Sequence, residues 1–214
     1  MIITKTYNTT VALIIILISS PLIANAYVPY LSVGYGISIF EESGFIETGD
    51  LRSGFIDWES ARHFDAALGL DFENSYLIEI AASYLETDGG INTDANVAIA
   101  DIEAGLNYLY LGIDGKKEFS DFDKFTPFFC AGVGVVDVAL TDPATNSELN
   151  ETSFSYNLGA GISYNFSDNL DFYVKYSYYY FRELKFNSPL PGSDDELHMD
   201  LGLQQFTFGL CWSF

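Results

Sequence analysis

The segment 154–166, FSYNLGAGISYNF, alternates between large apolar residues and small polar ones. Phe, Tyr, Leu, Ala and Ile occupy its even-numbered positions, whereas Ser, Asn and Gly occupy the odd-numbered ones. Successive side chains of a β-strand point to opposite faces of the sheet. The segment is therefore predicted to be a strand with one bulky apolar face and one small polar face.

Seven further segments share this alternation. The predicted strands are residues 31–40, 63–71, 76–85, 96–111, 125–136, 154–166, 170–181 and 206–214. Tight turns are expected at 72–75 and 167–169, a longer link at 112–124, and long polar loops at 41–62, 87–95, 138–153 and 182–200. Short turns at one end and long loops at the other are typical of a transmembrane barrel. We therefore predict an all-β fold, an eight-stranded antiparallel up-and-down transmembrane β-barrel.

The composition of the polar face decides whether such a barrel faces water or lipid. A soluble, lipocalin-like barrel keeps its apolar face inside and its polar face in water. Here the polar face is mostly Gly, Ser, Thr, Asn and Ala, which suits the narrow interior of an eight-stranded barrel. The apolar face is bulky, and its rings lie near strand ends, where aromatic girdles meet the headgroups. We expect the polar face to line the lumen and the apolar face to contact lipid.

The charge of the chain excludes one class of partner. The 214 residues include 30 Asp and Glu but only 9 Lys and Arg, for a formal net charge of −21. General electrostatic binding to nucleic acid requires clustered Lys and Arg. No nucleic-acid partner is therefore expected.

The start of the chain has the layout of a secretory signal peptide. The apolar run VALIIILI at 11–18 is followed by the small residues Ala-Asn-Ala at 24–26. The run is too short to span a bilayer, which takes ~20 apolar residues. We expect a signal peptide over 1–26, cleaved before Tyr27 on export, and a barrel domain over 27–214.

Three motifs resemble those of a known family. The strand 126–134, TPFFCAGVG, resembles the TPY-x-GAG-x-G strand of small outer-membrane barrels, and the residues around 159–170 resemble their next hairpin. The chain end, with Leu210, Trp212 and Phe214 at alternate positions, resembles the signal read by the barrel-assembly machinery. The chain thus resembles the OmpA/Opa-type outer-membrane β-barrel superfamily, which includes surface antigens. The resemblance implies the outer membrane of a Gram-negative bacterium, with outer-membrane lipid and the assembly machinery as partners.

A charge cluster is predicted inside the barrel. Its members are Asp65, Glu79, Asp101, Glu103 and Lys175. A buried charge without a partner is costly, so Lys175 should pair with an acid, and Glu79 or Glu103 is the expected one. The cluster could act as a cation-selective constriction or as a hydrogen-bonded plug. Because eight-stranded interiors are usually filled by side chains, the plug is favoured.

The alternation also assigns rings to the two faces. In the predicted strand 96–111 it places Leu106 and Tyr108 toward lipid. The rings of Phe128, Tyr173 and Tyr179 are expected to point inward, where they would occlude the lumen.

The sequence predicts neither catalytic residues nor metal ligands nor a cofactor. His63 and His198 are expected as solvated residues near the loops, and a catalytic triad is defined by geometry that composition alone does not supply. The acidic loops lack the ligand spacing of a calcium site. Cys130 and Cys211 point inward from strands that are not neighbours, whereas a disulfide needs Cα atoms within ~7 Å, so free thiols are expected.

The long loops carry the functional prediction. Residues 41–60 contain six acidic residues and one arginine, Arg52, interleaved with rings such as Phe45, Phe55 and Trp58. Exposed rings amid charge can form a recognition surface, and loops on a rigid scaffold commonly carry function. We predict a surface structural or interaction protein whose acidic loops contact host or cell-surface molecules. A small cation-preferring pore is the alternative, and an outer-membrane enzyme is a more remote one.

Overall fold

The computed structural model describes residues 27–41, 43–47, 52–72, 75–93, 102–119, 124–142, 147–187 and 196–214. The strands are β1 (Tyr27–Phe40), β2 (Ser43–Glu47), β3 (Arg52–Trp58), β4 (Ala61–Phe72), β5 (Tyr76–Thr93), β6 (Ile102–Glu118), β7 (Phe125–Asp142), β8 (Ser147–Ser167), β9 (Leu170–Asn187) and β10 (Glu196–Ser213). The described residues include no helix that is long and apolar enough to cross a membrane.

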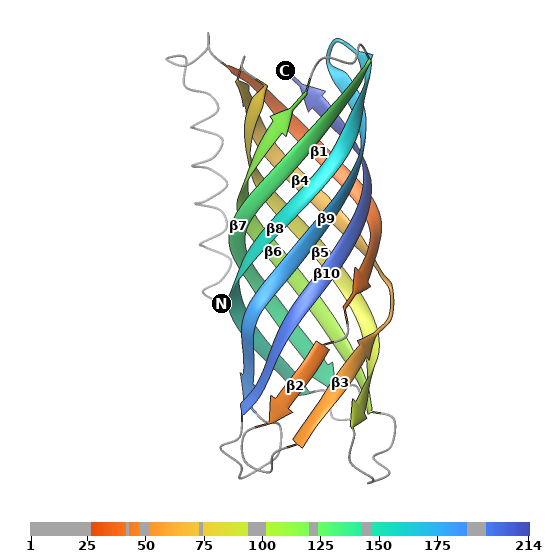
Figure 1. Ribbon diagram of the computed structural model, residues 1–214, viewed down its shortest axis with the longest axis vertical. Helices are drawn as coiled ribbons and strands as arrows, with labels where there is room; N and C mark the ends of the chain where they lie inside the picture. Colours follow the sequence, from red (N-terminus) through yellow and green to blue (C-terminus); the bar gives the residue numbers. More distant parts are fainter. Residues whose placement is uncertain are drawn as a thin grey trace.

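Eight of these strands close into an antiparallel barrel, which confirms the predicted fold. Around the barrel they run β1-β4-β5-β6-β7-β8-β9-β10, and pairing of β1 with β10 closes the cylinder seen in Figure 1. The closing register sets Tyr30 opposite Ser213 and Phe40 opposite Leu203. A closed barrel satisfies backbone N–H and C=O groups between strands, which hydrocarbon requires because it offers no water.

Two tight connections and one slightly longer connection join strands at one end, which we call the short-turn end. The predicted turns between β4 and β5 and between β8 and β9 are confirmed. Ser75, with φ of 61°, donates its N–H to the Phe72 carbonyl at 3.0 Å and so tightens the first of them. The predicted link 112–124 is wrong, because β6 continues to Glu118 and leaves a connection of 119–124.

At the opposite, loop end, the strands are longer than predicted. Within the expected loop 41–62, strands β2 and β3 pair with each other and with β10 and β5 (Figure 1). Backbone bonds bridge the breaks between the strands: the Glu41 N–H donates to the Gly202 carbonyl at 2.9 Å and the Glu59 N–H to the Asp88 carbonyl at 3.0 Å. The predicted loop is therefore largely barrel wall.

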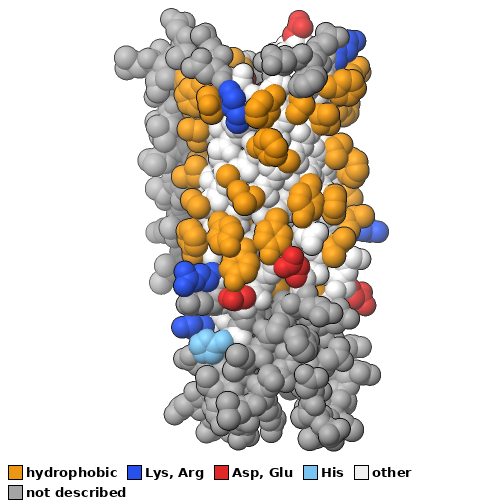
Figure 2. All heavy atoms as spheres, viewed as in Figure 1, with side chains coloured by type: hydrophobic (Ala, Val, Ile, Leu, Met, Phe, Trp, Pro, Cys, Tyr) orange, Lys and Arg blue, Asp and Glu red, His pale blue; other side chains and the backbone are white. Residues whose placement is uncertain are grey.

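The outer surface of the barrel carries a wide apolar belt. Figure 2 shows apolar side chains over the upper part of the face in view. Phe208, for example, is 64% exposed. Other belt residues on seven further strands are Val33, Ile37, Phe64, Ile80, Tyr84, Ile113, Val133, Val135, Phe154, Leu158, Phe172 and Val174. Along β5 the belt runs from Tyr76 to Tyr84, which in a tilted strand gives a height of ~20 Å. This height suits the hydrocarbon of a bilayer.

The belt ends abruptly toward the loop end. The next outward residue after Phe64 is Arg62, after Tyr84 it is Glu86, and after Val135 it is the exposed Asp137. Arg62 and Glu86 lie directly opposite each other on neighbouring strands. We call this the boundary ring, and its described exposed members are Arg62, Glu86, Asp137, Thr152 and Arg182. The ring marks where the outer wall passes from hydrocarbon into water.

The interior of the barrel changes from polar to apolar near the level of the boundary ring. Beyond the boundary ring the lumen is filled by an apolar cluster, which we call the outer core: Trp58, Leu85, Leu106, Val136, Val138, Leu140, Phe181, Leu184, Leu201 and Leu203. Nearer the short-turn end the interior is polar. The barrel is thus of membrane type within the belt and of soluble type beyond it.

The structure shows that the predicted orientation of β6 is wrong. Leu106 and Tyr108 point into the barrel and are almost fully buried, whereas Leu109, Leu111 and Ile113 face outward. The assignment failed because β6 crosses the boundary ring. Its inner face is apolar outside the membrane and its outer face is apolar inside it, so both faces carry large residues.

A charge in the middle of the belt should destabilise the barrel. We expect Ile80→Arg to lower the free energy of unfolding by about 2–4 kcal/mol, because the guanidinium would enter hydrocarbon. Thr152→Arg, beyond the belt, should change it by less than about 1 kcal/mol. Denaturant titration in phospholipid vesicles measures both. Equal stability of the two variants would show that the belt is not in lipid.

Candidate functional site

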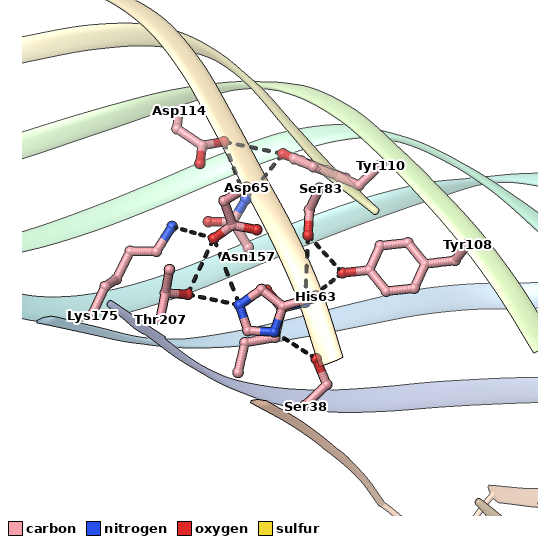
Figure 3. Close-up of polar contacts among 11 residues, drawn as sticks. Ser38, His63, Asp65, Ser83, Tyr108, Tyr110, Asp114, Asn157, Lys175 and Thr207 are labelled. Carbon is pink, nitrogen blue, oxygen red and sulfur yellow. Dashed lines mark hydrogen bonds and ion pairs between the residues drawn. The ribbon is translucent and has the colours of Figure 1, made fainter. Parts of the chain in front are cut away.

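The polar half of the lumen holds a connected network centred on His63 (Figure 3). His63, on β4, is fully buried. Its Nδ1 lies 2.9 Å from Ser38 Oγ on β1, and its Nε2 lies 2.9 Å from Thr207 Oγ1 on β10. The expectation of a solvated histidine near the loops is therefore wrong for His63, which ties three adjacent strands together from inside.

Asp65 joins the lysine of the lumen to this network. Its Oδ2 accepts a hydrogen bond from Thr207 Oγ1 at 3.1 Å and lies 3.3 Å from Lys175 Nζ on β9. His63 Nε2 is 3.9 Å from the same oxygen. Lys175 thus pairs with Asp65 and not with the expected Glu79. Thr207 and Asp65 meet over Gly34 of the intervening strand β1, and Lys175 is the register partner of Thr207, a placement that alternation within one strand does not give.

Two further clusters fill the lumen beside the Asp65–Lys175 pair. Tyr108 OH lies 2.9 Å from Ser83 Oγ and accepts a hydrogen bond from Gln205 Nε2. Further along β6, Asp114 Oδ1 accepts hydrogen bonds from Tyr110 OH at 3.0 Å and from Asn157 Nδ2 at 3.1 Å. The Gln205–Tyr108 bond joins β10 to β6 and the Asn157–Asp114 bond joins β8 to β6, so these two bonds link strands that are not neighbours in the sheet.

Asp114 and its partners were missed at the sequence level. Asp114 falls within the predicted link 112–124, so it was not assigned to a strand. The alternation Tyr108, Tyr110, Gly112, Asp114 is the signal that could have extended β6 and placed this acid in the lumen.

Nearer the short-turn end, three more charged side chains have partners inside the barrel. Tyr30 OH donates to Glu79 Oε2 at 2.7 Å. Lys116 Nζ lies 2.7 Å from Glu118 Oε1 and 4.4 Å from the centroid of the Phe128 ring. Lys116 is a second inward cation that the sequence prediction missed, again because β6 was ended too early.

Rings complete the closure of the lumen. Phe128 and Tyr179 are buried, as predicted, and Tyr173 lies over Gly34 and Gly209. A Cβ atom at Gly209 would lie 2.3 Å from the Tyr173 ring, so the glycine makes room for it. The cavity left between Asp65, Glu79, Lys116 and Lys175 has a volume of about 30 Å³. Such a space holds one or two water molecules. The described side chains therefore leave little free space in this part of the lumen.

Some predicted site residues cannot be compared with the structure. Asp101 lies outside the described residues, and the side chain of Glu103 on β6 is not among those described. The same holds for the side chains of Phe45 on β2 and of Arg52 and Phe55 on β3. Their predicted roles remain predictions.

Other predicted residues are placed clearly. Trp58, expected among exposed rings, is buried in the outer core with its ring 6.0 Å from that of Phe40. Leu210, Trp212 and Phe214 point outward on the closing strand, and the rings of the last two stack at 5.9 Å. Their role as an assembly signal remains a prediction.

The thiols and histidines form no reactive arrangement among the described residues. Cys130 and Cys211 are free and both line the small cavity. His198 lies opposite Lys185 on the neighbouring strand β9. Within the described ranges, no three His, Cys, Asp or Glu side chains are grouped so as to hold a metal ion.

The fold and the lumen can now be compared with known proteins. A model of the outer membrane protein beta-barrel domain matches residues 9–214. The chain belongs to this family. It is therefore a bacterial outer-membrane barrel, and the resemblance to small outer-membrane barrels is confirmed. No curated protein sequence matches the chain significantly.

Three solved outer-membrane proteins show how widely this fold is shared. OprG from Pseudomonas aeruginosa is 12% identical with a TM-score of 0.68, covering 88% of this chain and 96% of that one. AlkL is 14% identical with a TM-score of 0.56, covering 89% and 92%. Neisserial surface protein A is 14% identical with a TM-score of 0.53, covering 87% and 97%. At these identities the likeness shows the fold alone.

Replacement of Lys175 should show how much its ion pair with Asp65 contributes to the stability of the barrel. We expect Lys175→Met to destabilise this outer-membrane barrel by about 3–5 kcal/mol, because it leaves the Asp65 carboxylate buried without its cation. Adding Asp65→Asn should restore much of the loss, whereas adding Glu79→Gln should not. Denaturant unfolding in vesicles measures each variant. Rescue by Glu79→Gln alone would mean that Lys175 pairs with Glu79 in the membrane.

Proposed function

We propose that this outer-membrane barrel is a non-conducting scaffold that displays an acidic wall to cationic partners at the cell surface. The observation that carries the proposal is the double closure of the lumen. Within the belt, the polar network and the rings leave a cavity of about 30 Å³. Beyond the belt, the outer core fills the interior with side chains such as Leu106, Leu201 and Leu203.

An ion would have to cross two different obstacles to pass through such a barrel. In the polar half it would displace groups that already bond one another, including Asp65 with Lys175. In the outer core it would lose its hydration among apolar side chains without gaining ligands, which is costly for any charge. Both obstacles favour the interaction protein over the small pore.

The part of the barrel beyond the boundary ring suits display. Here β2 and β3 are paired into the wall between β10 and β5. The wall gives this segment a fixed backbone, and preorganised surfaces lose less entropy on binding. The segment 41–60 contains six acidic residues against one arginine, and the segment 194–200 contains four acidic residues and neither Lys nor Arg. The chemistry at this end therefore complements a cationic partner.

Conductance in a planar bilayer tests the closed lumen. We expect the refolded protein to give no steady single-channel steps, and Val133→Ala on the outer face to behave identically. A variant that combines Tyr173→Ala, Tyr179→Ala and Leu203→Ala should begin to conduct, because it removes side chains from both obstacles. Steady cation-selective steps in the parent protein would favour the pore.

Binding of polylysine to the protein in nanodiscs tests the acidic wall. Replacing Glu47 and Asp57 with Gln and Asn should weaken binding, whereas Asp168→Asn at the short-turn end should not. Binding of the parent should fall steeply between 0.1 and 1 M salt, since the Debye length shrinks from about 10 to 3 Å. Equal binding by all three proteins would count against the loop end as the binding surface.

A further inference from the structure

The apolar belt is hollowed at one place. Across β5 to β9 its outer surface forms a groove of about 770 Å³. Small residues form the floor of the groove: Gly115 on β6, Ala131 on β7 and Ala160 on β8. Gly115 and Ala131 are direct partners in the register. The groove therefore lies where two or three neighbouring strands lack the large side chains found on the rest of the belt.

Larger residues stand on both sides of this floor. Ile78 on β5 and Leu158 on β8 line the groove and are both more than half exposed. A Cβ atom added to Gly115 would come no closer than 3.9 Å to any described neighbour, so no side chain of the described residues fills the space directly over this glycine. The volume falls within the ~300–1,000 Å³ of pockets that bind small molecules.

A cation stands at the short-turn end of the groove. Lys117 lines it, lies opposite Phe129 in the register, and places Nζ 3.9 Å from the centroid of the Tyr76 ring. Phe129 and Tyr76 are outward-facing belt residues, so Lys117 belongs to the lipid-facing side. A lysine there keeps its stem in apolar surroundings and its ammonium near the headgroups. The position is notable because the chain has only 9 Lys and Arg against 30 acidic residues.

We propose that this groove binds one phospholipid of the leaflet at the short-turn end, which is the periplasmic end in outer-membrane barrels with short turns there and long loops opposite. An acyl chain lies over Gly115, Ala131 and Ala160, and the lipid phosphate lies beside Lys117. The apolar walls match the chain, and the cation matches the phosphate. A second copy of the protein fits less well, since a two-fold axis along the membrane normal would bring a second Lys117 to the same depth as the first.

Native mass spectrometry of the refolded protein tests the proposal. The protein would be incubated in detergent with phosphatidylglycerol or phosphatidylcholine of the same acyl chains. We expect one tightly retained phosphatidylglycerol and weaker retention of phosphatidylcholine, whose choline opposes Lys117. Lys117→Gln should reduce phosphatidylglycerol affinity about fivefold, as expected for one lysine near a lipid headgroup. Ala131→Leu should abolish retention by filling the floor.

Two matched variants serve as controls. Val133→Leu adds bulk to the same strand face at a residue that does not line the groove, and Lys124→Gln removes a cation at the short-turn end that does not line it either. Both should retain lipid as the parent does, and heat-modifiable migration on a gel shows that each variant is folded. Equal retention by folded Lys117→Gln, Ala131→Leu and the controls would overturn the proposal. So would a protein dimer, without bound lipid, that Ala131→Leu abolishes.

Discussion

Each long strand of this barrel passes through two environments along its length, the hydrocarbon of the bilayer and the water beyond it. Inside the bilayer its outer side chains must be apolar, and beyond the boundary ring they must be polar. Tyr84 and Glu86 show the change within two residues of β5. Because alternate side chains point to opposite faces, the inward-facing side chains change polarity at the same level, but in the opposite direction. The interior is polar behind the belt and apolar behind the wetted wall. This reversal explains how the lumen is filled. Behind the apolar belt it is filled by polar side chains, and behind the polar wall it is filled by apolar ones.

The two halves of the interior are held in different ways. In the polar half, stability depends on pairing, because His63, Asp65 and Lys175 would each be costly to bury alone. The bonds join β1, β4, β9 and β10, which include the two strands that close the cylinder. In the outer core, stability comes from removing side chains such as Val138 and Leu203 from water. In the function that we propose, a barrel sealed in both ways presents partners with its outer surfaces, namely the belt and the wall beyond it.

The sequence predicts the membrane half of the fold well. In β7, β8 and β10, strict alternation places Phe129, Leu158 and Phe208 outward, as the structure does. It fails where the strands leave the bilayer, because the rule of apolar outside and small polar inside reverses there. For that reason β6 was given the wrong face, and β2 and β3 were read as loop. The sequence predicted that Lys175 pairs with an acid but did not identify Asp65 as that acid. Which acid meets Lys175 depends on the stagger of strands around the cylinder, and no single strand contains that information.

The change of solvent along the strands can be measured directly. Spin labels placed in turn at Ile80, Tyr84, Glu86 and Asp88 on the outer face of β5 would report contact with oxygen, which concentrates in hydrocarbon, or with a water-soluble nickel complex. Labels at Ile80 and Tyr84 should respond to oxygen, and labels at Glu86 and Asp88 should respond to nickel. A belt that continues past Glu86, with high oxygen contact at Asp88, would contradict the boundary ring and the reversal of the interior that depends on it.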